Sequence, residues 1–236
     1  EFASHGYPTL LTTTTHIMKP DFLSDESYIE NEDLGQLANI FTNLKKNTLP
    51  LAALGIPEKV VNSNIKWRSP SSDFCKKIAE FSKKFSTKNP YKFLKILCEG
   101  DGSKRLPIKL PKDGEPVFFP KTDTVIGVIG LSCLGKPIKE TLFRYELLPN
   151  LTSLDNYFIK SLQSADIVTT DFLYRLCLSE KGLRKNITSQ KFCIIFNQAD
   201  ILDEKALAEV ITLRNQLQTK GICSHIISVK NNYIIN

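Results

Sequence analysis

Four polar clusters of the chain directly follow apolar runs, and these clusters hold its candidates for chemistry. They occupy residues 12–16, 99–105, 130–136 and 197–200. In an α/β protein, ligands bind outside the carboxyl ends of the strands, so polar residues at those positions are examined first.

The cluster after residue 98 begins with two acids, Glu99 and Asp101, each followed by a glycine. An acid at a strand end can hold Mg²⁺ or its water, as the second acidic element of a P-loop nucleotidase does. Gly100 and Gly102 would let the backbone approach a phosphate. An ordinary acidic turn explains the same residues, and both interpretations stay open.

The cluster at residues 197–200 reads Asn-Gln-Ala-Asp. It is close to the N-K-x-D pattern that recognises guanine, in which the Asp accepts hydrogen bonds from the ring N–H and the exocyclic amine. Gln198 stands where the pattern has a Lys whose stem covers the purine. The alternative for Asn197 and Asp200 is a capped turn that opens the next helix.

Residues 130–136 match the GxxxxGK pattern of a phosphate loop. A working loop continues with Ser or Thr, whose hydroxyl binds Mg²⁺. Pro137 follows instead, and it offers neither a hydroxyl nor a backbone N–H. We therefore predict that this segment is not a phosphate loop.

The remaining polar candidates are hydroxyls, histidines and cysteines. Residues 12–15 are four threonines, whose hydroxyls could coordinate a metal or an attacking water, although threonine is favoured in strands in any case. His5, His16 and His225 are far apart, and the six cysteines form no CxxC, so neither a catalytic triad nor a zinc site is predicted.

The composition is that of a globular protein. The chain has 236 residues, of which 42% are hydrophobic and 24% charged, with a net charge of +6. These values exclude a disordered chain, a collagen and a simple coiled coil. The apolar runs are too short for a membrane span, and the scattered lysines form no basic stripe with aromatics for nucleic acid. We expect a cytoplasmic protein with reduced thiols.

Predicted strands and helices alternate along the chain, which favours a single α/β domain over residues 1–236 with a mainly parallel sheet. Residues 100–122 form a long loop between two strands, and such loops are usually functional. The predicted strands are 9–15, 49–54, 93–98, 123–131, 167–168, 191–196 and 225–229, and the predicted helices are 33–46, 71–85, 154–162, 170–178 and 203–220.

Taken together, these clusters resemble the signature of the YqeC family of bacterial proteins. Residues 99–138 are similar to the family pattern E-A-D-G-S-x-R-L-P-L-K-A-P, E-P-V-I-P and V-I-G-V-x-G-L-x-A-L-G-K-P. The threonine run, Val168-Thr169, Lys181-Gly182-Leu183 and the N-x-A-D of residues 197–200 follow in the family's order. The resemblance covers nearly the whole chain.

The resemblance implies a three-layer Rossmann-like fold of the P-loop NTPase type. The family has a G-G-G-K-T-T phosphate loop one helix before the threonine strand, and this sequence has none. Residues 1–5 read as the last turn of that helix, with Gly6 at its C′ position. We therefore expect the first strand, the phosphate loop and most of the first helix to be missing, and the missing strand to lie between the strands at residues 9 and 93. Smaller departures from the family pattern are Gln198 and His16, where the family has Lys, and Gly100, where it has Ala.

The resemblance also implies a function: an accessory or maturation factor for selenium-dependent molybdenum hydroxylases that binds ATP or GTP with Mg²⁺ in its intact form. Its partners would be such a hydroxylase or its maturation proteins. Nucleoside triphosphatase activity is left open, and the alternative is a non-hydrolysing module that docks a partner protein or cofactor. The implied site residues are Asp101 and Glu99 for the metal, Thr14, Thr15, Lys104, Arg105 and Lys109 for the phosphates, and Asn197, Gln198 and Asp200 for the base.

Overall fold

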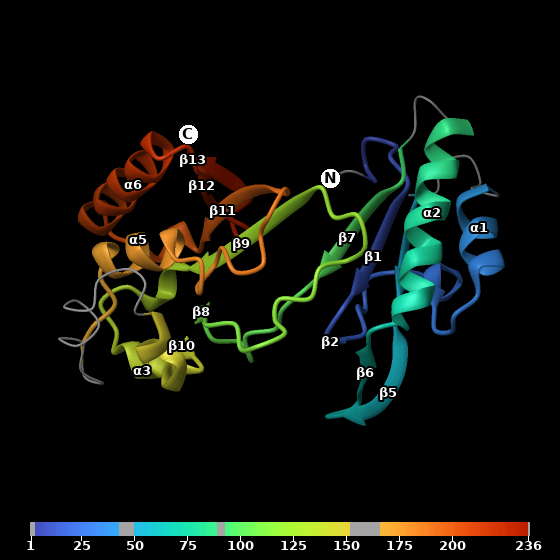
Figure 1. The fold of residues 1–236 in the computed structure, drawn as a ribbon, viewed down its shortest axis with the longest axis horizontal. Helices are drawn as coiled ribbons and strands as arrows, with labels where there is room; N and C mark the ends of the chain where they lie inside the picture. Colours follow the sequence, from blue (N-terminus) through green and yellow to red (C-terminus); the bar gives the residue numbers. More distant parts are fainter. Residues whose placement is uncertain (1–2, 43–49, 89–92, 152–165, 236) are drawn as a thin grey trace. The chain divides into compact units, whose positions relative to one another are not determined.

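The computed structural model describes residues 3–42, 50–88, 93–151 and 166–235. The chain divides into two compact units, which are described separately (Figure 1). Unit 1 comprises residues 1–102 and 117–121, and unit 2 comprises residues 103–116 and 122–236. The prediction of a single domain stays a prediction.

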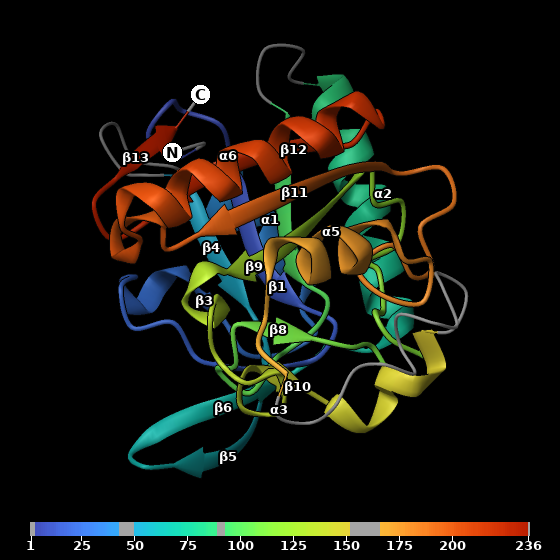
Figure 2. The ribbon, with the colours of Figure 1, turned by 90° about the vertical axis from the view of Figure 1, so that its left-hand side faces the viewer.

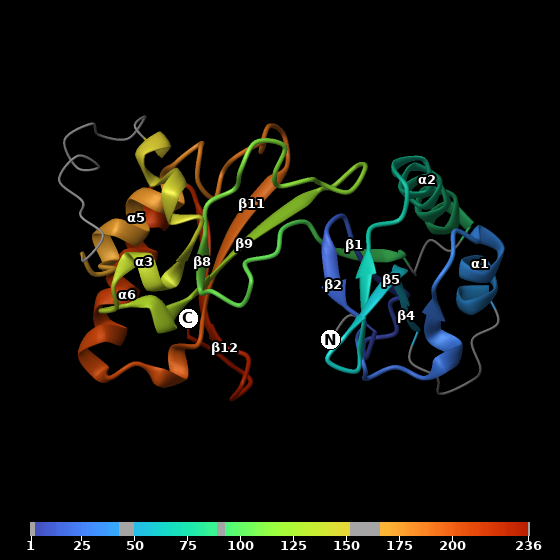
Figure 3. The ribbon, with the colours of Figure 1, turned by 90° about the horizontal axis from the view of Figure 1, so that it is seen from below.

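Unit 1 contains a parallel sheet in the order β3-β4-β1-β7. Two helices lie on one side of this sheet (Figures 1 and 3). Their apolar residues pack with those of the strands into one core, which includes Leu10, Leu37 and Ile78. Ser71 caps the second helix through a hydrogen bond from the Phe74 N–H to its hydroxyl. The elements are β1 (Thr9–Thr13), β3 (Tyr28–Ile29), β4 (Leu51–Leu54), β7 (Lys95–Glu99), α1 (Leu34–Thr42) and α2 (Ser72–Lys88).

The pairing of β1 with β7 corrects one expectation. The two strands are direct neighbours, in a register that runs from Thr9 opposite Lys95 to Thr13 opposite Glu99. No further strand lies between them, and these two edges are paired with each other rather than open. The expectation of a gap came from the family's strand order, whereas the β1–β7 ladder satisfies the backbone groups of both edges.

A second, three-stranded sheet of unit 1 was not predicted. Its hairpin turns at Asn62 and Ser63, both with positive φ, as a two-residue hairpin turn requires. Trp67 is fully buried beneath Gly55, where a Cβ would lie 2.2 Å from the Trp67 ring. The sheet has the order β2-β6-β5, from β2 (His16–Met18), β5 (Ile56–Val61) and β6 (Asn64–Arg68).

Unit 2 contains a four-stranded sheet in the order β13-β12-β11-β9, in which β13 alone is antiparallel. Two helices cover one face of it (Figure 2). Thr169 and Asp203 cap these helices, and Gly221 with φ +76° ends the second. The elements are β9 (Thr124–Gly130), β11 (Lys191–Asn197), β12 (Cys223–Ser228), β13 (Tyr233–Ile235), α5 (Thr170–Leu178) and α6 (Glu204–Thr219).

The opposite face of this sheet is open to solvent in part. Side chains alternate between the faces of a strand, so the residues next to the buried Ile129 and Ile194 point away from the helices. On that face Ile126 is 53% exposed and Val128 is 56% exposed. We call this face the open face.

The long predicted loop contains a short strand of its own, β8 (Ile108–Lys109), which pairs with β10 (Leu142–Phe143). Val168 and Ile167 form isolated bridges to Leu134 and Pro137. The predicted helix at residues 154–162 lies outside the described residues. The remaining short elements are η1 (Asp25–Ser27), η2 (Leu131–Cys133), α3 (Ile138–Thr141), η3 (Tyr145–Leu151) and η4 (Ala199–Ile201).

The predicted α/β class with mainly parallel pairing is confirmed. Among the described residues, no helix has the length and apolar character to cross a membrane.

Candidate functional site

The carboxyl edge of unit 1 is formed by the ends of β1 and β7, and its threonines bind backbone carbonyls. Thr12 Oγ1 donates to the Leu54 carbonyl at 3.0 Å, and Thr13 Oγ1 donates to the Glu99 carbonyl at 3.1 Å. The Thr14 N–H also donates to Glu99 O, and Thr14 Oγ1 lies 2.5 Å from the Val117 carbonyl. The hydroxyl protons thus hold the strand ends together, and of these three threonines Thr14 alone is partly exposed.

The two acids predicted to bind metal also lie at the edge of unit 1. Glu99 is exposed at the end of β7, and Asp101 follows two residues later, half-buried. A Cβ at Gly100 would lie 3.2 Å from the Val117 carbonyl, so glycine suits this turn. Thr15 is partly exposed, and its N–H donates to Thr13 Oγ1 at 2.9 Å. The structure therefore brings Thr14 and Glu99 to one edge.

The three predicted phosphate-binding cations lie in unit 2 and differ in environment. Lys104 and Arg105 are exposed and adopt positive φ values of 51° and 66°. Lys104 Nζ lies 5.0 Å from the centroid of the Phe143 ring. Lys109 is buried, and its Nζ lies 2.9 Å from Glu115 Oε2. Only Lys104 and Arg105 present their charge to solvent.

Glu115 is the centre of an ion cluster with Lys109 and Arg144. The Arg144 guanidinium binds both carboxylate oxygens, through Nη1 to Oε2 and through Nη2 to Oε1 at 2.9 Å. The hydrogen bonds from Arg144 lower the pKa of Glu115 to about 2, and the Lys109 ammonium contributes in the same direction. Burial lowers the pKa of Lys109, against the opposing effect of Glu115. This cluster fixes the segment around β8 to β10.

The carboxyl edge of unit 2 carries the predicted base-binding residues. Asn197 Oδ1 accepts from the Gln198 N–H at 2.8 Å and from the Val229 N–H at 3.1 Å. Asp200 Oδ1 accepts from Ser228 Oγ at 2.6 Å, and the Asn231 N–H donates to that same hydroxyl oxygen. These bonds join the end of β11 to the end of β12.

Gln198 joins the end of β9 to the same edge. It adopts a left-handed conformation with φ 73°, and its Oε1 accepts from the Ser132 N–H at 3.2 Å. A Cβ at Gly130 would lie 2.7 Å from this oxygen, which explains glycine there. The ends of three parallel strands, β9, β11 and β12, thus meet around residues 197–200.

The GxxxxGK segment follows β9, and its amides are used within unit 2. The N–H groups of Leu134, Gly135, Lys136 and Ile138 donate to the carbonyls of Leu131, Val168, Cys133 and Asp166. The α3 helix that follows has only four residues. These N–H groups are therefore not available to a phosphate in this structure.

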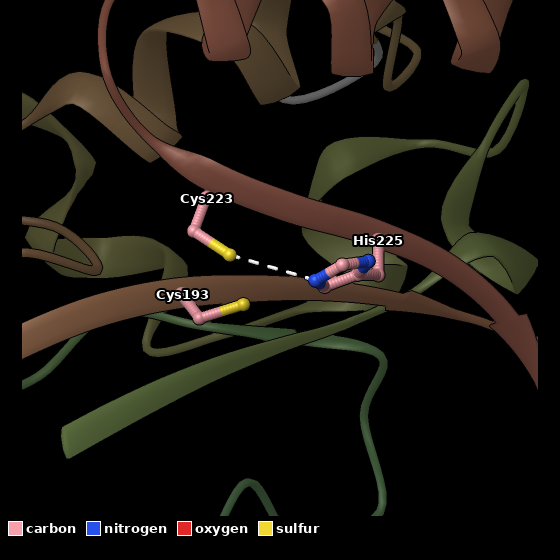
Figure 4. Close-up of side chains that lie close together, drawn as sticks. All are labelled: Cys193, Cys223 and His225. Atoms are coloured by element: carbon pink, nitrogen blue, oxygen red, sulfur yellow. Dashed lines mark hydrogen bonds between the residues drawn. The ribbon is translucent and has the colours of Figure 1, made fainter. Parts of the chain in front are cut away.

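Sequence reasoning missed one group of chemically active side chains, Cys193, Cys223 and His225, on the open face of unit 2 (Figure 4). Their potential ligand atoms all lie within 4.8 Å of one another, and Cys223 Sγ is 3.5 Å from His225 Nε2. The sequence suggested that His225 is isolated, and in the structure it is not. The available signal was Cys-x-His within a strand, which places both side chains on one face.

A comparison with protein families matches residues 1–146 to the model described as YqeC protein. No curated protein and no solved structure gives a significant match. The match spans more than half of the chain, including the threonine run, the acidic cluster and the segment from β8 to β10. The chain therefore belongs to the YqeC family.

Proposed function

We propose that this chain is an accessory factor for the maturation of selenium-dependent molybdenum hydroxylases and that it binds a purine nucleotide with Mg²⁺. We also propose that the α/β fold of this chain is of the three-layer Rossmann-like, P-loop NTPase type. The nucleotide proposal rests on the carboxylate of Asp200, which accepts a hydrogen bond from Ser228 where the ends of β9, β11 and β12 meet.

The hydrogen bonding of Asp200 favours guanine over adenine. Its Oδ1 accepts from Ser228, and its Oδ2 accepts no hydrogen bond from any other described residue. The side chain is half-buried, so the second oxygen can be reached by a ligand. Guanine presents a ring N–H and an adjacent amine to such a carboxylate, whereas adenine presents a ring nitrogen that would repel it. Because Ser228 fixes the carboxylate, little entropy is lost when the base binds.

Gln198 and Asn197 complete the proposed base site. Gln198 is exposed, and its hydrogen bond to Ser132 holds its stem in one place beside the Asp200 loop. The stem can cover one face of the purine, as a Lys stem would. Asn197 acts indirectly, since its Oδ1 accepts from two backbone N–H groups and thereby shapes the loop.

The proposed metal ligands belong to unit 1 and the proposed phosphate contacts belong to unit 2, and each set is proposed for its own unit. Oxygen ligands suit Mg²⁺, so we propose that Asp101 holds the ion, directly or through water, with Glu99. The lone pairs of Thr14 and Thr15 assist. Lys104 and Arg105 contact the phosphates or another anionic substrate, because their charges are exposed. Lys109 is bound to Glu115, so its part is to position this segment.

The test of the base site compares guanosine and adenosine monophosphates by saturation-transfer NMR at millimolar ligand. We expect a stronger response from the guanine nucleotide, and we expect Asp200→Asn to reduce that preference by roughly tenfold, as for a hydrogen bond to a charged group. Glu204→Gln is the matched control, since it removes one exposed carboxylate from the helix that follows. Equal affinity of the unmodified protein for both nucleotides would refute the base site.

A second candidate function is a non-hydrolysing module that docks a partner protein. The observation in its favour is the open face, where Ile126 and Val128 are more than half exposed on the strand β9. The test is retention of a selenium-dependent molybdenum hydroxylase on the immobilised chain without nucleotide. Loss of retention in Val128→Glu but not in Asp200→Asn would favour docking over nucleotide binding.

A further inference from the structure

Three side chains with soft or borderline ligand atoms gather at one point of the open face of unit 2. Cys193 on β11 lies directly opposite Cys223 on β12 in the parallel register. His225 is two residues after Cys223, so it projects from the same face of the sheet. Figure 4 shows the three side chains turned toward a common centre. Regular strand geometry alone therefore brings the three residues together.

The distances within this group are close to those of a tetrahedral zinc centre. With Zn–S about 2.3 Å and Zn–N about 2.0–2.1 Å, tetrahedral angles place the sulfurs about 3.8 Å apart and each sulfur about 3.6 Å from the nitrogen. The Cys223 Sγ to His225 Nε2 distance is 3.5 Å, and all three ligand atoms lie within 4.8 Å of one another. Small rotations of the side chains are enough to close the set around an ion.

We propose that Cys193 Sγ, Cys223 Sγ and His225 Nε2 bind one Zn²⁺ ion, with a fourth position open to water or to a ligand atom of a substrate or partner. Two thiolates and a neutral imidazole balance the charge of the ion. Three protein ligands with one open position are typical of zinc sites that act on a bound molecule, whereas structural sites have four.

The environment of the thiols supports a metal rather than simple packing. Cys75, Cys133 and Cys177 are buried, as small apolar residues are, but Cys223 and His225 are exposed. A bound zinc ion deprotonates its cysteine ligands, so it can hold the two thiolates side by side.

The neighbours of the group on the open face are apolar. Ile126 lies opposite Cys193, and Val128 and His225 lie opposite Ile195. No described Asp or Glu belongs to the group. Hard cations such as Mg²⁺ prefer oxygen ligands, so this site is distinct in chemistry from the proposed magnesium site at Asp101.

The first test measures zinc directly on untagged protein, reduced with a phosphine and freed of metal by a chelator. After incubation with Zn²⁺ and gel filtration, we expect one zinc per chain by elemental analysis. Cys223→Ser and His225→Gln should each bind zinc at least tenfold more weakly. Both residues are exposed, so these variants should keep the circular dichroism spectrum of the unmodified protein.

The second test uses Co²⁺ as a spectroscopic substitute, which separates ligation from a structural effect. The thiolate-to-cobalt absorption should fall by about half in Cys193→Ser or Cys223→Ser at saturating Co²⁺, as expected for two thiolate ligands. It should persist in His225→Gln, where only the visible bands shift. Cys98→Ser and His16→Gln are controls that remove one thiol or one imidazole of unit 1.

Two results would overturn the proposal. One is unmodified protein that retains no zinc after gel filtration. The other is zinc or cobalt binding that Cys193→Ser, Cys223→Ser and His225→Gln leave unchanged, or that the two control variants weaken equally.

Discussion

The carboxyl edges of the two sheets use polar side chains in opposite ways. In unit 1 the threonines of β1 donate their protons to the carbonyls of Leu54 and Glu99. In unit 2 the oxygens of Asn197 and Asp200 accept from the groups around the end of β12. A hydroxyl has one proton to give, whereas a carboxylate has two oxygens, so Asp200 can be held by Ser228 and still receive a ligand.

The difference shows that a position after a strand does not by itself define a binding residue. At the edge of unit 1 the hydroxyls of Thr12 and Thr13 donate to backbone carbonyls, and the role proposed for the nearby acids is cation binding. At the edge of unit 2 an acceptor is fixed in place, which suits recognition of a donor-rich base. Variants at the two edges, and in the ion cluster around Glu115 in unit 2, test this comparison.

The largest expected effect is on the ion cluster that fixes the loop of unit 2. Glu115→Gln should lower the free energy of unfolding by about 3 kcal/mol, because it leaves Lys109 and Arg144 with an uncompensated positive charge in a largely buried site. Urea unfolding at neutral pH measures the loss. The same change at the exposed Glu140 should cost almost nothing, and an equal loss at both positions would contradict this assignment.

The same cluster predicts a pH dependence. The pKa of Glu115 falls from 4.5 to about 2 on folding, so its stabilisation is complete above about 4.5 and disappears as the pH falls toward 2. The unfolding free energy of Glu115→Gln should therefore decline less steeply over this range than that of the unmodified protein. Parallel declines would show that Glu115 does not titrate in this way.

The next effect concerns the acids at the edge of unit 1. If the remaining oxygen atoms there bind a cation, Asp101→Asn should weaken binding by about 2 kcal/mol, roughly thirtyfold, through the loss of one charged ligand. Titration with Mn²⁺ in place of Mg²⁺, followed by water proton relaxation, measures it. Asp21→Asn is the control, since Asp21 is an exposed acid of the same unit. Titrations that do not change in Asp101→Asn would disprove the metal assignment.

A smaller effect tests the structural role of the threonines. Thr13 is fully buried, and its hydroxyl donates to Glu99 O and accepts from the Thr15 N–H. Thr13→Val keeps the shape but leaves the N–H unpaired, and it should cost about 1 kcal/mol of stability. Thr212→Val, on the exposed side of α6, should cost less. If Thr13→Val left the stability unchanged but abolished cation binding, Thr13 would have a functional role. The contrast between the two carboxyl edges would then be lost.

Sequence patterns predicted the regular elements well where local signals agreed. The helix at residues 170–178 was predicted with its bounds, and in the structure Thr169 caps it. The capped helix after Asp203 and the buried strand β11 also follow from the pattern. The hairpin of β5 and β6 was missed, since Pro57 and four charged residues hide its alternation and its burial depends on Trp67.

The candidate site was harder to predict, because its properties depend on partners far away in sequence. Lys104 and Lys109 are lysines of the same segment, but only Lys109 is buried, against Glu115 and the Phe143 ring. Cys193 and His225 are separated by a helix and meet only through the register of β11 and β12. Asp200 was predicted from its motif, whereas its hydrogen bond to Ser228 required the structure.

The smallest expected effect is that of the phosphates on nucleotide affinity. Tight phosphate binding in proteins of this class uses successive free N–H groups at a helix N-terminus together with a Lys. In the GxxxxGK segment those N–H groups donate to carbonyls of unit 2, and Pro137 offers none. Lys104 and Arg105 remain, and exposed charges of this kind contribute about 0.2–1 kcal/mol each.

The affinities of this chain for guanosine and for GTP with Mg²⁺ should therefore lie within roughly tenfold of each other, both with dissociation constants in the millimolar range. Isothermal calorimetry measures the GTP affinity, with ATP as the comparison. Micromolar binding of either triphosphate would contradict this prediction, because it would require free N–H donors that the described residues do not show. A comparison of the GTP affinities of Lys136→Ala and of the control Lys139→Ala would then test whether the segment after β9 rearranges to supply them.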